Sequence, residues 1–207
     1  MYGIKEGYVE NLKAYQREQT ESGASVHQIE TYRKAASLIK IHRLQSVLDI
    51  GCGMPLKLEK YISPLCKDIT GIDLKPTIRK IKNIRKKTGK YAFGKWIICN
   101  VEYNVPELSK VPDLIIIADV IEHLRNPDNL LTFLVHKCKG AYVILSTPDR
   151  DTLNNPNGPP RNKKHVREWT LSEFVKYINS RGLCIEDCYP ADDPQGYEDI
   201  ICVCKVK

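Results

Sequence analysis

The sequence contains no apolar run long enough to cross a membrane. Its longest runs of apolar residues are five residues long, as in Leu114 to Ala118, whereas a transmembrane helix needs about 20. Internal repeats and low-complexity stretches are also missing, which excludes solenoid and fibrous architectures. The segment Tyr2 to Glu10 is polar and mixed, unlike the apolar centre of a secretory leader. We therefore expect a cytoplasmic protein with no membrane span.

Disulfide patterns are missing as well. None of the eight cysteines forms a Cys-x-x-Cys pair, and Cys99, Cys202 and Cys204 lie inside apolar runs. In a cytoplasmic protein such residues are expected to be reduced thiols in the core. The 207 residues comprise 42% apolar and 28% charged side chains, which is typical of one ordinary globular domain and excludes a disordered chain.

Positive charge is concentrated in one segment. Residues 75–95 hold nine basic side chains and no acidic one, so the rest of the chain holds 23 basic against 25 acidic residues, a net charge of −2 within the +7 of the whole. The basic segment could attract nucleic acid, anionic lipid or an acidic partner. The simpler interpretation, which we favour, is a solvated helix face.

Short apolar runs rich in β-branched residues alternate with helical stretches. Strands are expected at residues 46–50, 68–73, 96–100, 114–119, 141–147, 183–189 and 199–206, and helices at 25–41, 55–62, 76–88, 127–139 and 170–181. Ser25 and Gln28 have capping-box spacing at the start of the first helix, as Thr170 and Glu173 have in the last. The alternation predicts an α/β fold, with a mostly parallel sheet of seven strands and helices on both faces. Only about eight residues join the last two strands, too few for a crossover helix, so the last strand should run antiparallel.

The most specific segment is Val47 to Gly53, with the sequence VLDIGCG. It predicts a buried strand that ends in a glycine turn, followed at once by a helix whose first N–H groups can face an anion. Dinucleotide-binding folds use such a turn with a third glycine, in the pattern Gly-x-Gly-x-x-Gly. That third position is Leu56 here, which disfavours a nicotinamide or flavin cofactor.

From about residue 30 to residue 205 the chain resembles class I S-adenosylmethionine-dependent methyltransferases, which have a Rossmann-like fold. Through the segment Asp119 to Leu124 it resembles in particular the subgroup of ubiquinone-biosynthesis O-methyltransferases. The resemblance implies S-adenosyl-L-methionine as the cofactor. The implied cofactor-binding residues are Asp49, Gly51, Cys52 and Gly53 for the methionine end, Asp73 and Leu74 for the ribose, Asn100 and Val101 for the adenine, and Asp119 and Val120 beside them.

Two of these implied residues have simpler interpretations when taken alone. In the family, the acid that corresponds to Asp73 accepts hydrogen bonds from both ribose hydroxyls, a role that suits an acceptor-only carboxylate. By itself Asp73 could be a helix cap. Asn100 stands where the family usually has an acid that reads the adenine amino group, and its amide oxygen could accept the same bond. By itself Asn100 could be a turn residue.

The segment Asp119 to His123 also resembles the Glu-x-x-Glu-His pattern that binds a divalent ion in ubiquinone-type and small-RNA 2′-O-methyltransferases. In the small-RNA enzymes a histidine from the loop after the fifth strand completes the site, and His165 is the candidate here. Asp119 replaces the first glutamate and is shorter by one methylene, so the set Asp119, Glu122, His123 and His165 departs from the family. Without a metal, His123 or His165 could act as the catalytic general base near neutral pH. His123 could also simply pack on its helix.

A long loop from Pro148 to Glu168 follows the fifth expected strand and is the predicted substrate-contacting region. Its candidate contacts are Arg161, Lys163, Arg167 and the adjoining Trp169. Their positive charge favours an anionic or phosphate-bearing small-molecule acceptor. Methyltransferases that modify base amino groups carry an Asn/Asp-Pro-Pro-aromatic motif after the fourth strand. This chain has Asp119 to Glu122 there, which disfavours that activity.

We therefore predict an S-adenosylmethionine-dependent methyltransferase that methylates an oxygen of a small molecule. One alternative is an RNA ribose or tRNA methyltransferase that uses the basic segment 75–95. Another is a catalytically silent protein that keeps the fold for binding. The expected organisation is a single methyltransferase domain over residues 1–207, with a lid or arm at 1–24, a leading helix at 25–45 and a Rossmann-like core at 46–207. The oligomeric state stays open.

Overall fold

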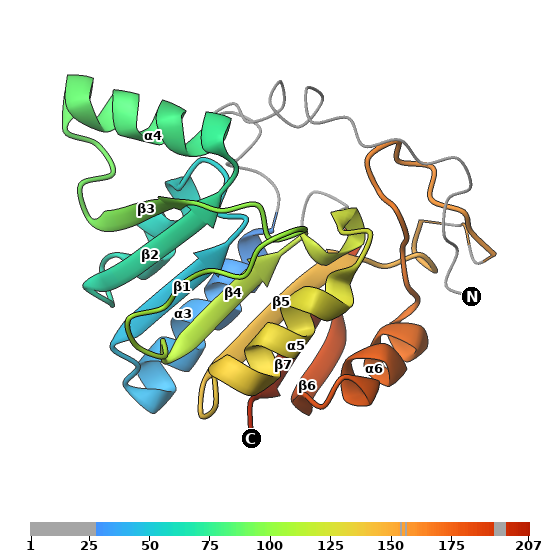
Figure 1. Ribbon diagram of the computed structural model, residues 1–207. Helices are drawn as coiled ribbons and strands as arrows, with labels where there is room; N and C mark the ends of the chain where they lie inside the picture. Colours follow the sequence, from blue (N-terminus) through green and yellow to red (C-terminus); the bar gives the residue numbers. More distant parts are fainter. Residues whose placement is uncertain (1–27, 154, 156, 193–197) are drawn as a thin grey trace.

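Seven strands form one mixed sheet in the order β3-β2-β1-β4-β5-β7-β6 (Figure 1). The computed structural model describes residues 28–153, 155, 157–192 and 198–207, so the lid or arm expected at residues 1–24 lies outside the described residues. The strands are β1 (Ser46–Ile50), β2 (Asp68–Asp73), β3 (Gly94–Ile98), β4 (Leu114–Ala118), β5 (Tyr142–Pro148), β6 (Cys184–Asp192) and β7 (Glu198–Lys205). The helices are α3 (Ile29–His42), α4 (Lys75–Thr88), α5 (Pro127–Lys137) and α6 (Leu171–Ser180), with a short π-helix η1 (Leu58–Ile62) and a 3₁₀ turn η2 (Ile121–His123).

The pairing of the strands confirms the predicted fold class. β1, β2, β3, β4 and β5 pair in parallel, whereas β7 runs antiparallel between β5 and β6. Parallel neighbours need a crossover between them, and helices supply it along most of the chain, while the short β6–β7 connection permits only an antiparallel neighbour. Within the described ranges, no helix is both long and apolar enough to cross a membrane.

The two faces of the sheet are covered by different helices. Leu131 of α5 and Phe174 of α6 belong to the hydrophobic cluster on one face, and Ala35 of α3 and Ile78 of α4 belong to the cluster on the other (Figure 1). A sheet buried on both faces needs apolar residues along its whole length. Strand β4, with the sequence LIIIA, is buried at every position.

The expected elements differ from the observed ones mainly at their ends. The capping box expected at Ser25 and Gln28 is wrong for Gln28, because α3 begins at Ile29 and Gln28 is its N-cap residue, with a φ of 63°. Ser25 lies outside the described residues. The Gln28 side-chain amide instead donates to the Ala118 carbonyl at the end of β4 (3.2 Å). The strand expected at residues 96–100 is displaced to Gly94–Ile98, so Asn100 falls in the turn that follows.

Asp49 is an acidic residue at the centre of the buried sheet. Its side chain is fully buried, and its Oδ2 accepts a hydrogen bond from the Tyr32 hydroxyl on α3 (2.7 Å). Its Oδ1 has no hydrogen-bond partner among the described residues. Burial raises the pKa of Asp49 from 3.8 to about 7, against the opposing effects of the Tyr32 hydrogen bond and the Lys57 charge. Between about pH 4 and pH 7 the folded protein therefore holds a proton that the unfolded chain has lost.

This difference predicts how Asp49→Asn changes stability with pH. Wild-type stability falls as the pH rises through this window, because the folded state binds more protons than the unfolded state. The asparagine side chain cannot ionise. The free energy of unfolding of the variant, relative to that of the wild type, should therefore rise by about 1.4 kcal/mol per pH unit across the window. Urea unfolding at several pH values across and above the window measures the difference, with Asp151→Asn at an exposed position as the control. A pH-independent difference between wild type and Asp49→Asn would contradict the prediction.

Candidate functional site

The glycine turn after β1 lies against the loop after β4. Gly51 and Gly53 have positive φ values of 75° and 52°. A Cβ at Gly51 would come within 2.4 Å of Val120 Cγ2, so the approach of the two loops requires glycine. The amides of Gly51 and Cys52 donate to the Ile72 carbonyl of β2 (2.8 and 3.0 Å). The turn expected to contact the methionine end of the cofactor is therefore fixed beside the ends of β2 and β4.

Asp73 connects this turn to the start of α4. Its Oδ2 accepts a hydrogen bond from the Gly53 amide (2.9 Å) and its Oδ1 accepts one from the amide of Leu74, the N-cap residue of α4 (2.7 Å). Burial raises the pKa of Asp73, while hydrogen bonds from Gly53, Thr77 and Leu74 oppose that effect. Because each carboxylate oxygen can accept more than one hydrogen bond, Asp73 can serve as a local brace and still accept further donors.

Asn100 and Val101 lie in the turn after β3. The Asn100 side-chain oxygen accepts the Glu102 amide (3.1 Å), so Asn100 does act as a turn residue. Glu102 in turn accepts the backbone amide of Arg125 (2.8 Å), which joins this turn to the segment after β4. The loops after β1, β2, β3 and β4 thus lie at one edge of the sheet, where open α/β sheets bind their ligands (Figure 1).

Asp119 occupies the first position after β4 with a strained backbone. Its φ is 52°, which is uncommon for a residue other than glycine. Its amide donates to the Ser146 carbonyl (3.1 Å), and its Oδ1 accepts the Ser146 hydroxyl (2.6 Å). The neighbouring β5 therefore holds this side chain. Asp119 is not one of the residues that cluster as possible metal ligands among those described.

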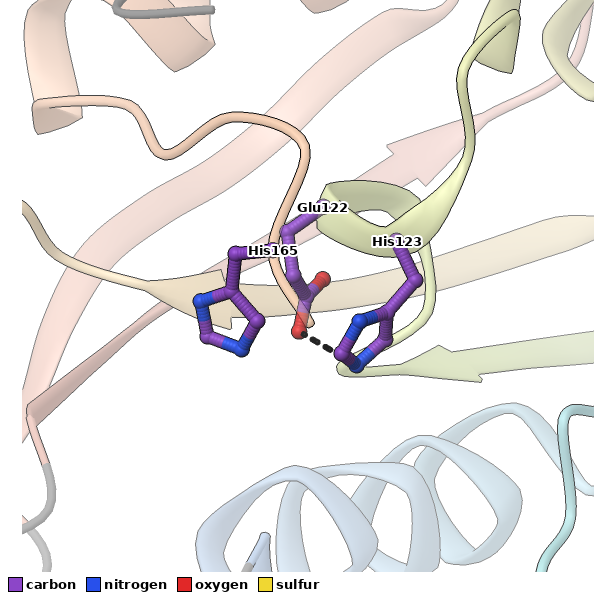
Figure 2. Close-up of side chains that lie close together, drawn as sticks. All are labelled: Glu122, His123 and His165. Atoms are coloured by element: carbon purple, nitrogen blue, oxygen red, sulfur yellow. Dashed lines mark ion pairs between the residues drawn. The ribbon is translucent and has the colours of Figure 1, made fainter. Parts of the chain in front are cut away.

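Glu122, His123 and His165 do form such a cluster. Each offers a ligand atom, and these atoms lie within 4.8 Å of one another (Figure 2). Glu122 and His123 come from η2, and His165 comes from the loop between β5 and α6. From the sequence, His123 could have packed on a helix together with the adjoining Glu122. Instead they form a single 3₁₀ turn, because the chain is extended at Leu124 before α5 starts at Pro127.

Burial controls the electrostatics of this cluster. Burial raises the pKa of Glu122 well above its usual value, and the charge of Asp119 raises it further. Glu122 Oε2 accepts the Thr147 hydroxyl (3.3 Å), whereas Oε1 has no hydrogen-bond partner in the described chain and lies 3.7 Å from His123 Nε2. Burial and the neighbouring His165 lower the pKa of His123 to about 4, so its imidazole is neutral at neutral pH.

These residues fit a divalent cation. A fully buried carboxylate oxygen without a hydrogen-bond partner is costly unless a cation or donor reaches it. Two imidazoles and one carboxylate form a donor set that suits Zn²⁺, Mn²⁺ or Fe²⁺, and neutral imidazoles are the form that binds metal. His123 Nδ1 contacts the Lys164 carbonyl (3.1 Å), so Nδ1 carries a proton and Nε2 carries the lone pair.

The residues predicted to contact substrate separate into two groups. Arg161 and Lys163 are exposed, and Arg167 is partly buried with its Nη2 donating to the Arg125 carbonyl (2.6 Å). Trp169 was predicted to contact substrate, but it is fully buried and stacks on Tyr177 with 5.5 Å between ring centroids. It packs there because the chain forms a β-bridge between residues 149 and 169 that turns the indole into the core.

Sequence reasoning missed Glu168. Its side chain is buried, and its Oε1 lies 2.6 Å from His165 Nδ1. The only sequence signal is the spacing of three residues between His165 and Glu168, which is too common to stand out within a polar loop.

Comparisons with known proteins agree with the fold and the motifs. Residues 15–186 match the model of a family described as a methyltransferase domain. The ubiquinone biosynthesis O-methyltransferase of Schizosaccharomyces pombe is 24% identical over 160 residues, which are 68% of this chain and 58% of that protein. The chain thus spans a little over half the length of this relative.

Solved structures share the fold at low sequence identity. The N-methyltransferase NodS from Bradyrhizobium japonicum, in complex with S-adenosylhomocysteine, aligns with a TM-score of 0.67 and 18% identity, covering 94% of this chain and 97% of NodS. The methyltransferase domain of bacterial CtHen1 aligns with a TM-score of 0.65 and 22% identity, covering 86% of this chain and 99% of that domain. Because the family model covers most of the sequence, the resemblance to class I methyltransferases is confirmed, and the chain belongs to the methyltransferase domain family.

Proposed function

We propose that this protein transfers a methyl group from S-adenosyl-L-methionine to a hydroxyl oxygen of a small molecule. The observation that carries the proposal is the cluster of Glu122, His123 and His165, in which Glu122 and His165 are buried and His123 is partly exposed. The cluster begins two residues after Val120, which packs against Gly51 of the glycine turn. A proton-accepting or metal-binding group is what an oxygen acceptor requires, because a neutral hydroxyl is a weak nucleophile. The O-methyltransferase relative in fission yeast supports the same chemistry.

The cofactor would lie across the carboxyl ends of β1, β2 and β4. Gly51 and Gly53 allow its methionine end to approach the backbone, and Asp73 would accept hydrogen bonds from its ribose hydroxyls. Asn100 and Val101 would border the adenine. The S-adenosylhomocysteine bound to NodS, which shares this fold, supports the same cofactor for this chain.

Glu122, His123 and His165 would hold a divalent cation through one carboxylate oxygen and two imidazole nitrogens. Such a cation would lower the pKa of an acceptor hydroxyl and orient it. The protein itself keeps His123 neutral and excludes water from Glu122, which is fully buried. In the absence of a cation, His123 Nε2 would be the atom that takes the hydroxyl proton, since its Nδ1 is bound to the Lys164 carbonyl. With a pKa of about 4, however, His123 is a weaker base than the base near neutral pH that was expected from the sequence. Exposed Arg161 and Lys163 would attract an anionic acceptor.

Cofactor binding can be tested by calorimetry with S-adenosylhomocysteine. We expect the wild type to bind it and Asp73→Ala to bind it more weakly by at least about 1.5 kcal/mol, the usual contribution of hydrogen bonds to a charged group. Asp73→Asn keeps one acceptor oxygen and should lose less affinity for S-adenosylhomocysteine than Asp73→Ala does. Asp151→Ala, at an exposed position, is the control and should bind as the wild type does. Binding of NADH in place of S-adenosylhomocysteine would contradict the proposal, and an unchanged affinity in Asp73→Ala would show that Asp73 is only a brace.

The role of the cluster can be tested by turnover with a panel of catechols and anionic phenols, measured as S-adenosylhomocysteine release. We expect EDTA to abolish turnover and Mn²⁺ or Zn²⁺ to restore it. Glu122→Gln, His123→Ala and His165→Ala should each lower activity at least ~100-fold, since even residues behind metal ligands cost about 10–100-fold. Glu107→Gln, at an exposed position, is the control. Turnover that resists EDTA but is lost in either histidine variant would indicate a general base, and full activity in all variants would contradict the site.

A second candidate is methylation of an RNA ribose. All nine basic side chains between residues 75 and 95, most of them on α4, are exposed and could contact phosphates. A short RNA added to the same turnover panel tests this candidate directly. If α4 binds the RNA, RNA affinity measured at rising salt concentrations should fall steeply, and a lack of RNA binding at low salt would exclude this candidate.

A further inference from the structure

Glu168 is buried directly behind His165. Its side chain is only 2% exposed and that of His165 only 9%, and the Glu168 Oε1 to His165 Nδ1 distance is 2.6 Å. The Glu168 backbone is fixed as well, because the guanidinium of buried Arg150 donates from Nη1 to the Glu168 carbonyl (3.2 Å). The other end of that guanidinium binds the Glu173 carboxylate of the α6 capping box (2.7 Å). The carboxylate is therefore held against one nitrogen of the His165 ring.

The hydrogen bonds around Asn162 identify which His165 nitrogen carries the proton. The Lys164 amide can only donate, and it donates to Asn162 Oδ1 (3.0 Å). The Asn162 Nδ2 group is then the atom that meets His165 Nε2 at 3.0 Å, and an amide nitrogen can only donate. His165 Nε2 must therefore be an acceptor. In the neutral ring the proton is on Nδ1, which points at Glu168.

The same segment orients the other imidazole of the cluster. The Lys164 carbonyl accepts from His123 Nδ1 (3.1 Å), and the amides of Val166 and Arg167 donate to the Glu122 carbonyl (2.8 and 3.4 Å). The two imidazole rings meet edge to face, with 4.9 Å between centroids and 71° between planes. In Figure 2 one His165 nitrogen faces the Glu122 carboxylate and the other faces away from it.

From this geometry we propose that Glu168 is a positioning residue for His165. Together with Asn162 it holds the ring as the tautomer with Nδ1 protonated, and the Nε2 lone pair, which accepts from Asn162 Nδ2, is the ligand position that a cation would take from that amide. A histidine that binds metal through one nitrogen commonly donates its other N–H to a carboxylate, which fixes its tautomer and strengthens it as a ligand. The role of this orientation in metal binding rests on the proposed function, whereas the tautomer itself is a property of the metal-free protein.

The test uses the whole chain without metal and three variants. Glu168→Leu removes the acceptor at similar volume, Glu168→Gln keeps an oxygen that can accept from Nδ1–H, and Glu107→Leu is the exposed control. Long-range ¹⁵N–¹H NMR correlations report which ring nitrogen is protonated. The chain has five histidines, so the His165 signals are assigned by their loss in His165→Gln. Calorimetric titration with Mn²⁺ alone measures metal affinity.

We expect the Nδ1-protonated tautomer in the wild type, Glu168→Gln and Glu107→Leu. Glu168→Leu should show a mixture of the two tautomers, because Asn162 still favours an unprotonated Nε2, and about 10–100-fold weaker Mn²⁺ binding. An unchanged tautomer in Glu168→Leu, or an Nε2-protonated ring in the wild type, would overturn the proposal. Glu168→Gln serves as the decisive variant if Glu168→Leu does not fold, because a loss of the Nδ1-protonated form there would also overturn it. A wild type that does not bind Mn²⁺ would refute the metal site, while the NMR result would still decide the role of Glu168.

Discussion

The backbone carbonyl of Glu122 holds the candidate site together. It accepts the amides of Val166 and Arg167, so the loop after β5 is joined to the turn after β4. Through this connection His165 reaches Glu122 and His123, although the two segments are far apart in the chain. Loops are the more mobile parts of a protein, and ligands placed on separate loops need such a link to keep a common geometry.

Hydrogen bonds between loops have the same effect at the proposed cofactor edge. The glycine turn is bound to β2 through the Ile72 carbonyl, Asp73 binds Gly53, and Glu102 binds the backbone at Arg125. The loops that would surround the cofactor are therefore positioned before it arrives. A site that is ordered in advance loses less conformational entropy on binding, which leaves more of the interaction energy for affinity.

The sequence-based expectations that were wrong concern residues whose neighbours come from other parts of the chain. Gln28 has the right spacing for a capping box, yet its amide binds the carbonyl of Ala118 on β4. Trp169 adjoins a polar loop, yet the bridge to Asp149 and the stack with Tyr177 place it in the core. Burying an indole contributes more free energy than a local preference for the surface can oppose, so packing decided its position.

The sequence by itself indicated where most strands and helices lie along the chain, the antiparallel last strand, the glycine turn and the α6 capping box, because each of them leaves a local pattern of residues. It also identified Glu122, His123 and His165 as candidates through a motif. Only the tertiary structure decided that these three side chains meet, that Asp119 binds Ser146 instead of joining them, and that Glu168 stands behind His165. The physical reason is that burial and long-range hydrogen bonds, which set those positions, depend on how the β4 and β5 loops lie against each other, and no local pattern records that arrangement.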